Sequence, residues 1–170
     1  MAEMSDGAPS GPDLSAGIPA SSVADGAMLL GHVGNDPVLV ARTDGSLYAI
    51  GATCTHYGGP LAEGILVGDT VRCPWHHACF SLKTGEPLRA PALDRVPCYR
   101  VEESAGNIFV RDAVEPPSLY LRTLSSPPTS VVIVGAGAAG VAAAEMLRRC
   151  GYADSIKLFD QLDTPPVDRP

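Results

Sequence analysis

The sequence predicts a mainly β protein, in which a small antiparallel β domain precedes an incomplete βαβ unit. From Ile18 to about residue 113, short apolar runs recur between turn residues, which is typical of antiparallel strands. Further on, residues 131–134 form an uninterrupted apolar run that leads through glycines into an Ala-rich helical pattern. The expected organisation is a flexible tail at 1–16, a β domain at 17–113, a Pro-rich linker at 114–130 and a βαβ unit at 131–170.

Composition narrows the functions that the chain can serve. The 170 residues carry a net charge of −7, without the basic surface that nucleic acid or an anionic membrane requires. The start has no basic and apolar leader, and no run of about 18 apolar residues occurs, so we expect a cytoplasmic protein. The five cysteines, an odd number, do not indicate a disulfide framework.

The elements of the β domain are predicted from the turn residues between them. The tail has few large apolar side chains to bury, so we expect it to be flexible. Asp44-Gly45 separates two apolar runs and is a strong hairpin signal. Residues 83–87 are predicted as a turn and residues 89–93 as a stiff loop. The runs expected to form strands are 27–32, 38–41, 47–50, 65–72 with a break at Gly68-Asp69, 96–102 and 107–111.

Two segments of this domain each contain one cysteine and one histidine. Cys54 and His56 follow one predicted strand and Cys73 and His76 follow another, in the pattern C-x-H-x16-C-x2-H. Two thiolates and two imidazoles suit a tetrahedral zinc ion or an iron–sulfur cluster. Structural zinc sites usually pair cysteines on one segment and histidines on another, whereas a Rieske [2Fe-2S] centre takes one of each from each loop. The spacing favours the cluster, with zinc or a chance surface cluster as alternatives.

The other three cysteines, Cys79, Cys98 and Cys150, are expected to be small buried hydrophobic residues or idle thiols. No pairing of a nucleophile with a base is apparent, so no catalytic residue is predicted, and these residues alone are not expected to form a complete enzyme.

The βαβ unit carries a glycine pattern at its first turn. Gly135, Gly137 and Gly140 form G-x-G-x-x-G between a predicted strand and helix, and Asp160 follows the second strand twenty residues later. In that context the pattern predicts dinucleotide binding, with the pyrophosphate at the helix N-terminus and the ribose on Asp160. A generic Gly-rich turn is the alternative. About 40 residues rarely hold a core alone, so we expect a fragment or a truncated product.

Residues 17–113 resemble a Rieske domain of the low-potential ferredoxin type. The resemblance rests on the two ligand pairs and on the neighbouring sequences Gly59-Pro60-Leu61 and Cys73-Pro74-Trp75-His76. A Rieske domain followed by a nucleotide-binding pattern resembles the apoptosis-inducing-factor-like FAD/NAD(P)-dependent oxidoreductases. The resemblance implies a [2Fe-2S] cluster held by the four Cys and His residues, and FAD at the glycine turn of a Rossmann-like domain. It also implies that residues 164–170 lie along the flavin, and that the partner is a redox protein or a fused flavoprotein domain.

Departures from the respiratory Rieske proteins carry further expectations. Gly59 and Trp75 stand where those proteins have a disulfide, so Trp75 is expected to pack beneath the loop. Ala78 and Phe80 stand where those proteins have hydroxyls that donate to sulfur. Because such hydrogen bonds stabilise the reduced cluster, the resemblance implies a low potential, roughly −150 mV. His77 is expected to face solvent, as are the outer edges of the ligand histidines.

Three functions remain open at this point. The first is electron transfer within a flavin-dependent NAD(P)H oxidoreductase. The second is a free-standing Rieske ferredoxin that serves an oxygenase, and the third is a zinc-stabilised structural domain.

Overall fold

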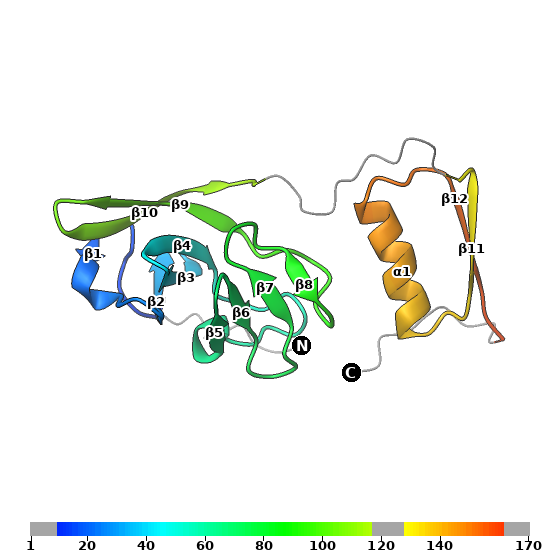
Figure 1. Cartoon of the computed structure of the whole chain (residues 1–170), viewed down its shortest axis with the longest axis horizontal. Coiled ribbons are helices and arrows are strands. Elements are labelled where there is room, and N and C mark those ends of the chain that lie inside the picture. The colour runs from blue at the N-terminus through cyan, green and yellow to red at the C-terminus, as the bar shows by residue number, and fades with distance from the viewer. Residues whose placement is uncertain (1–9, 117–127, 162–170) are drawn as a thin grey trace. The chain divides into compact units, whose positions relative to one another are not determined.

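The computed structural model describes residues 10–116 and 128–161. The chain separates into two compact units, Met1–Pro117 and Ser118–Pro170 (Figure 1), and this division falls inside the predicted linker. Most of that linker, and the segment 164–170, lie outside the described residues. Within the described ranges, no helix combines the length and the apolar character needed to cross a membrane.

The described chain is mainly β, as predicted. Its first unit also contains two short 3-10 turns, η1 (Ala20–Ser22) and η2 (Leu61–Glu63). The strands of the first unit are β1 (Ile18–Pro19), β2 (Ala27–Val33), β3 (Asp36–Thr43), β4 (Ser46–Gly51), β5 (Ile65–Val67), β6 (Thr70–Arg72), β7 (Cys79–Ser81), β8 (Pro87–Arg89), β9 (Cys98–Ser104) and β10 (Asn107–Val114).

Six of these strands form one antiparallel sheet in the order β1-β10-β9-β4-β3-β2. The predicted hairpin at Asp44-Gly45 is confirmed, since Thr43 pairs with Ser46 across it. Asp44 and Gly45 have φ angles of 49° and 73°, and two left-handed residues give a turn whose twist matches that of the flanking strands. The hairpin fixes the start and the register of β4, and the predicted ligand loop with Cys54 and His56, called the first metal loop below, follows the other end of that strand.

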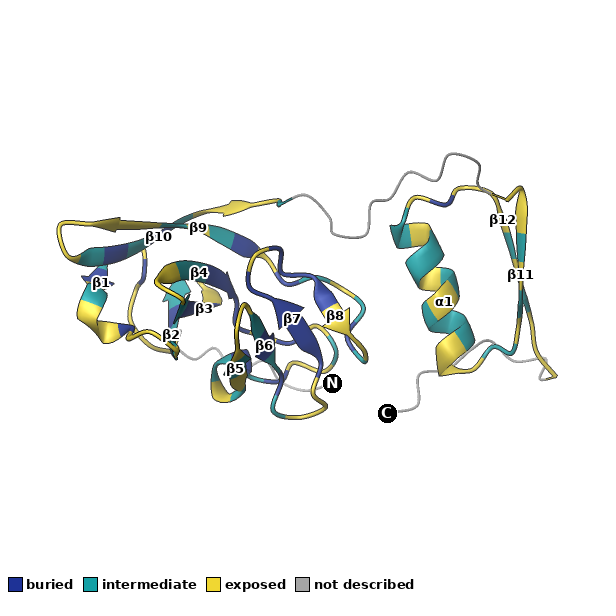
Figure 2. Cartoon of the chain, in the orientation of Figure 1, coloured by how far each residue is buried: buried dark blue, intermediate teal, exposed yellow. Residues whose placement is uncertain are grey.

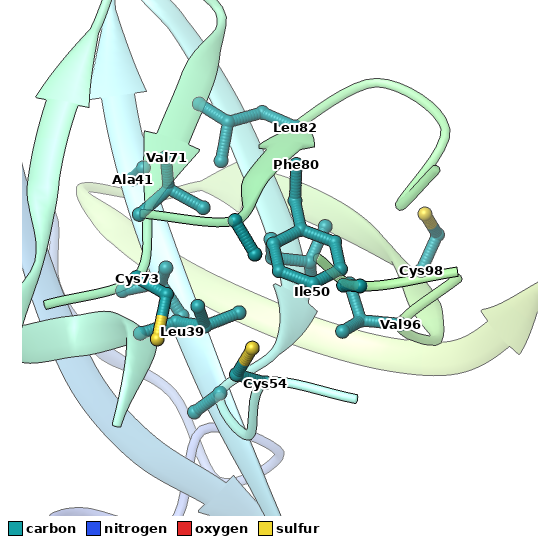
Figure 3. Close-up of a cluster of buried hydrophobic side chains, with 14 residues drawn as sticks. Leu39, Ala41, Ile50, Cys54, Val71, Cys73, Phe80, Leu82, Val96 and Cys98 are labelled. Atoms are coloured by element: carbon teal, nitrogen blue, oxygen red, sulfur yellow. The ribbon is translucent and has the colours of Figure 1, made fainter. Parts of the chain in front are cut away.

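The other four strands form a smaller sheet in the order β5-β6-β7-β8. Leu39 and Ile50 of the larger sheet and Val71 and Phe80 of the smaller sheet are fully buried in one core. Figure 3 shows this core, with the side chains of Cys54 and Cys73 at its edge. The loops that carry these cysteines are therefore held by the main core of the unit.

The predicted flexible tail is wrong for residues 12–16. Leu14 is fully buried in a second core with Val38 and Ile108. Its backbone N–H donates to the His32 carbonyl at 2.9 Å, and its carbonyl accepts from the Val110 N–H at 3.0 Å. A single leucine anchors the segment because the main chain also pairs with strands on either side.

The second unit contains β11 (Ser130–Val134), α1 (Ala138–Arg149) and β12 (Ser155–Phe159). The two strands are parallel, with Val131 opposite Ile156, as expected for the start of a βαβ unit. Exposed positions alternate with partly buried ones along both strands, as Figure 2 shows. Several of the exposed positions carry large apolar side chains. These exposed side chains are Val132, Val134 and Phe159.

Candidate metal centre

The first metal loop follows β4 and closes on its own main chain. The Cys54 N–H donates to the Gly59 carbonyl at 2.8 Å, and the Cys54 carbonyl accepts from the Gly58 N–H at 2.9 Å. Gly58 has a φ of +76°, a left-handed conformation that glycine adopts at little cost. The sequence Gly58-Gly59 therefore allows the chain to turn back tightly behind the cysteine.

The second metal loop follows β6 and repeats this pattern. The Cys73 N–H donates to the Ala78 carbonyl at 2.9 Å, and the Cys73 carbonyl accepts from the His77 N–H at 3.1 Å. His77 occupies the position that Gly58 has in the first loop, and it has a φ of +60°. The two cysteines thus sit at equivalent places in two similarly shaped loops.

The loops bring the four predicted ligand side chains together in two pairs. Cys54 and Cys73 are 3% and 2% exposed, and the Cys73 thiol is near enough to raise the pKa of the Cys54 thiol. The ring centroids of His56 and His76 are 4.9 Å apart, with the rings nearly perpendicular. His76 is exposed and His56 is half-buried. Metal binding by these four residues stays a prediction.

The predicted donors lie in one sulfur pair and one nitrogen pair. Buried His56 Nδ1 lacks a hydrogen-bond partner among the described residues, which is unusual for a buried polar atom and consistent with a metal ligand. In the described part of the chain, no three His, Cys, Asp or Glu side chains converge as one metal ion requires. A Rieske cluster needs only two protein ligands for each iron.

Burial raises the pKa of the Cys54 thiol. The backbone N–H groups of His56 and Tyr57 oppose this rise in the pKa, and the neighbouring Cys73 thiol reinforces it. The thiol is therefore protonated at neutral pH without a metal, so metal binding must release a proton.

Two exposed aromatic residues border the site, and the sequence analysis missed one of them. The Tyr57 ring lies 4.1 Å from the His56 ring and 6.0 Å from the His76 ring, between centroids. Trp75 is 54% exposed, so the expectation that it packs beneath the loop is wrong, although its ring covers Gly59. His77 is exposed, as predicted.

A third segment, between β8 and β9, also contacts the first metal loop. The Thr55 hydroxyl, between the cysteine and histidine of that loop, donates to the Asp94 carbonyl at 2.6 Å. Sequence reasoning did not identify this contact because its acceptor is a main-chain carbonyl, which every residue type possesses.

The residues of the predicted nucleotide site gather at one end of the second unit. Gly135, with a φ of +102°, and Asp160 line an open hollow of about 360 Å³ together with Val134, Phe159 and Gln161. Gly137 immediately precedes α1. At Gly140 a Cβ would collide with the Gly135 carbonyl, so glycine permits the close approach of helix and turn. Nucleotide binding by these residues stays a prediction.

Comparison with known proteins gives two groups of relatives. A family model described as the Rieske [2Fe-2S] domain matches residues 16–100. Apoptosis-inducing factor 3 from Homo sapiens is 38% identical over 150 residues, which cover 82% of this chain and 25% of the human protein. The chain therefore spans about a quarter of the length of that relative. The ferredoxin subunit of 3-phenylpropionate/cinnamic acid dioxygenase from Escherichia coli K12 is 38% identical over 94 residues, covering 54% of this chain and 87% of the subunit.

Solved structures of ferredoxins resemble the first unit. The ferredoxin of carbazole 1,9a-dioxygenase from Nocardioides aromaticivorans IC177 has a TM-score of 0.53 and 28% identity, covering 55% of this chain and 92% of that chain. A chain in the complex of reduced oxygenase and oxidized ferredoxin of carbazole 1,9a-dioxygenase has a TM-score of 0.52 and 34% identity, covering 55% of this chain and 96% of that chain.

Proposed function

The chain belongs to the Rieske [2Fe-2S] domain family, and on that premise we propose that Cys54 and Cys73 hold one iron of a cluster while His56 and His76 hold the other. The observation that carries this assignment is the arrangement of the donors in two pairs, with the His56 Nδ1 atom buried and lacking a partner among the described residues.

The chain's own residues give the site two different sides. When bound, a [2Fe-2S] cluster accepts and releases one electron. The buried Cys54 and Cys73 keep the sulfur side inside the core and away from water. His76, exposed on the other side, offers an electron a short path to a docked redox partner.

We assign the electron transfer to a flavin-linked oxidoreductase. The match to apoptosis-inducing factor 3 covers about 139 residues of this chain (82% of 170), which is more than residues 16–100 alone provide, so it extends toward the second unit. The hollow beside Gly135 and Asp160 supplies a place for the dinucleotide of FAD. We also place the protein in the cytoplasm, where five unbridged cysteines are stable.

A free-standing ferredoxin that serves an oxygenase is the second candidate. The identity to the E. coli ferredoxin subunit equals that to apoptosis-inducing factor 3, but that match covers only 54% of this chain and leaves much of the second unit unexplained.

Anaerobic purification with iron, sulfide and zinc analysis tests the metal assignment. We expect two irons and two sulfides per chain, and their loss on replacing either cysteine by alanine. One zinc ion in place of iron would overturn the assignment.

Flavin content tests the wider function. Protein from the complete reading frame should carry FAD as well as iron, and NAD(P)H should bleach the cluster spectrum. Iron without flavin, together with reduction only by a separate reductase, would favour the second candidate.

The potential of the cluster is a separate expectation. Ala78 and Phe80 are fully buried beside the second loop and offer no hydroxyl to a sulfur. A redox titration should therefore give a midpoint of roughly −150 mV, and a value above about +100 mV would contradict the proposal.

A further inference from the structure

An ion pair with one buried partner, between Glu86 and the 36% exposed Arg95, lies outside the set of predicted ligands. The Glu86 side chain is 5% exposed, and its Oε1 atom lies 3.0 Å from Arg95 Nη2. Glu86 ends the turn between β7 and β8, where its carbonyl accepts from the Ser81 N–H at 2.9 Å. Burying the Glu86 carboxylate costs solvation, so the pair is weak evidence for stability, and its role lies in the segments that it holds in place.

Arg95 joins three segments that are distant in the sequence. It belongs to the segment between β8 and β9, it pairs with Glu86 in the preceding turn, and its Nη1 atom donates to the Pro116 carbonyl at 3.4 Å, just beyond β10. The neighbouring Val96 N–H donates to the Gly85 carbonyl at 2.9 Å. The segment around Arg95 is thus joined twice to the turn between β7 and β8 and once to Pro116.

This fixed segment presents one acceptor to the first metal loop. Asp94 directly precedes Arg95, and its carbonyl accepts the hydrogen bond from the Thr55 hydroxyl at 2.6 Å. Thr55 stands between Cys54 and His56, so its side chain is one of the points at which the loop is tied to the rest of the unit. A shift of Asp94 would be transmitted to both predicted ligands on that loop.

We propose that Arg95 is a positioning residue for the metal centre. Its guanidinium, held by Glu86 and the Pro116 carbonyl, fixes the Asp94 carbonyl, and Thr55 uses that carbonyl to hold Cys54 and His56 at their spacing. The inference rests on the proposed ligation of a cluster by the first metal loop. Through Arg95, the segment that follows β10 at Pro116 is also linked to the first metal loop.

The test compares Arg95→Gln with Arg100→Gln in the full chain. Arg100 is an exposed arginine of β9 that pairs with Glu102 and Asp112, so its replacement removes the same charge away from the metal loops. Cluster loss to an iron chelator is followed by visible absorption, at a temperature where circular dichroism shows all variants folded. We expect Arg95→Gln to lose its cluster roughly 10- to 100-fold faster than wild type, as for other outer-shell contacts, and Arg100→Gln to match wild type.

Two further variants separate positioning from general destabilisation. Arg95→Lys keeps a cation opposite Glu86 and should recover part of the cluster lifetime. Thr55→Val removes the hydroxyl at the other end of the proposed link, so the double variant with Arg95→Gln should lose its cluster no faster than the quicker single variant. Additive effects, or a wild-type rate for Arg95→Gln, would overturn the proposal. Wild-type protein without two irons would instead overturn the proposed function.

Discussion

Replacing Gly59 by alanine should prevent cluster assembly while leaving the β domain folded. A Cβ at Gly59 would lie 2.7 Å from Cys73 Sγ and 3.2 Å from the Trp75 ring, whereas nonbonded carbon contacts normally lie at about 3.5–4.0 Å. The sulfur or the loop must therefore retreat by about 1 Å, but metal–ligand distances tolerate only about 0.2 Å. Moving Gly59 instead would disturb Cys54, whose N–H donates to the Gly59 carbonyl.

Iron and sulfide analysis of anaerobically purified Gly59→Ala protein measures this effect, with circular dichroism and urea unfolding as checks of the fold. The crowding should cost about 1–3 kcal/mol of unfolding free energy, which a folded domain can survive. Gly58→Ala is the matched control, because a Cβ there has no atom within 4 Å and only the left-handed backbone, with a φ of +76°, is strained. It should keep its cluster. A Gly59→Ala variant with wild-type iron, sulfide and visible spectrum would refute the reasoning.

Three other substitutions test separate features of the first unit. His77→Gly removes a Cβ held at a φ of +60° and should raise the free energy of unfolding in urea by about 0.5–1 kcal/mol; a decrease would contradict the strain. Leu14→Ala should lower the free energy of unfolding by about 2–5 kcal/mol, whereas exposed Ala16→Ser should change it by less than about 0.5 kcal/mol. Equal effects of the two substitutions would support the original expectation of a flexible tail. Burial raises the pKa of the Cys98 thiol from 9.0 to about 11, so its contribution to stability is complete below pH 9 and is lost as the pH rises toward 11. Thermal melts over this interval should show a loss approaching about 1.4 kcal/mol per pH unit that Cys98→Ala lacks, and parallel profiles would exclude this source.

The metal loops were predictable because their signal is local. The spacing of Cys54, His56, Cys73 and His76 identified both loops, and the structure shows each one following a strand. The hairpin at Asp44-Gly45 was equally accessible, since the turn requires residues that tolerate positive φ.

Features that depend on distant partners were not predictable in the same way. Leu14 is buried because β2 and β10 lie on either side of its backbone. Its own segment has no periodic pattern of apolar residues from which this burial could be predicted. The three-residue strands β7 and β8 are too short for alternation to be recognised and depend on pairing with each other and with β6. The link from Thr55 to the Asp94 carbonyl leaves no trace in residue identity.

Hydrogen bonds between main-chain atoms close each metal loop, and these bonds do not depend on the side chains of the predicted metal ligands. The backbone conformation of each loop therefore does not depend on which donor atom the loop carries. Replacing a histidine by cysteine should leave that conformation unchanged. A change of donor at one of these positions should therefore leave the loop backbone in place, and the reach of the new side chain alone decides whether it meets the bound group.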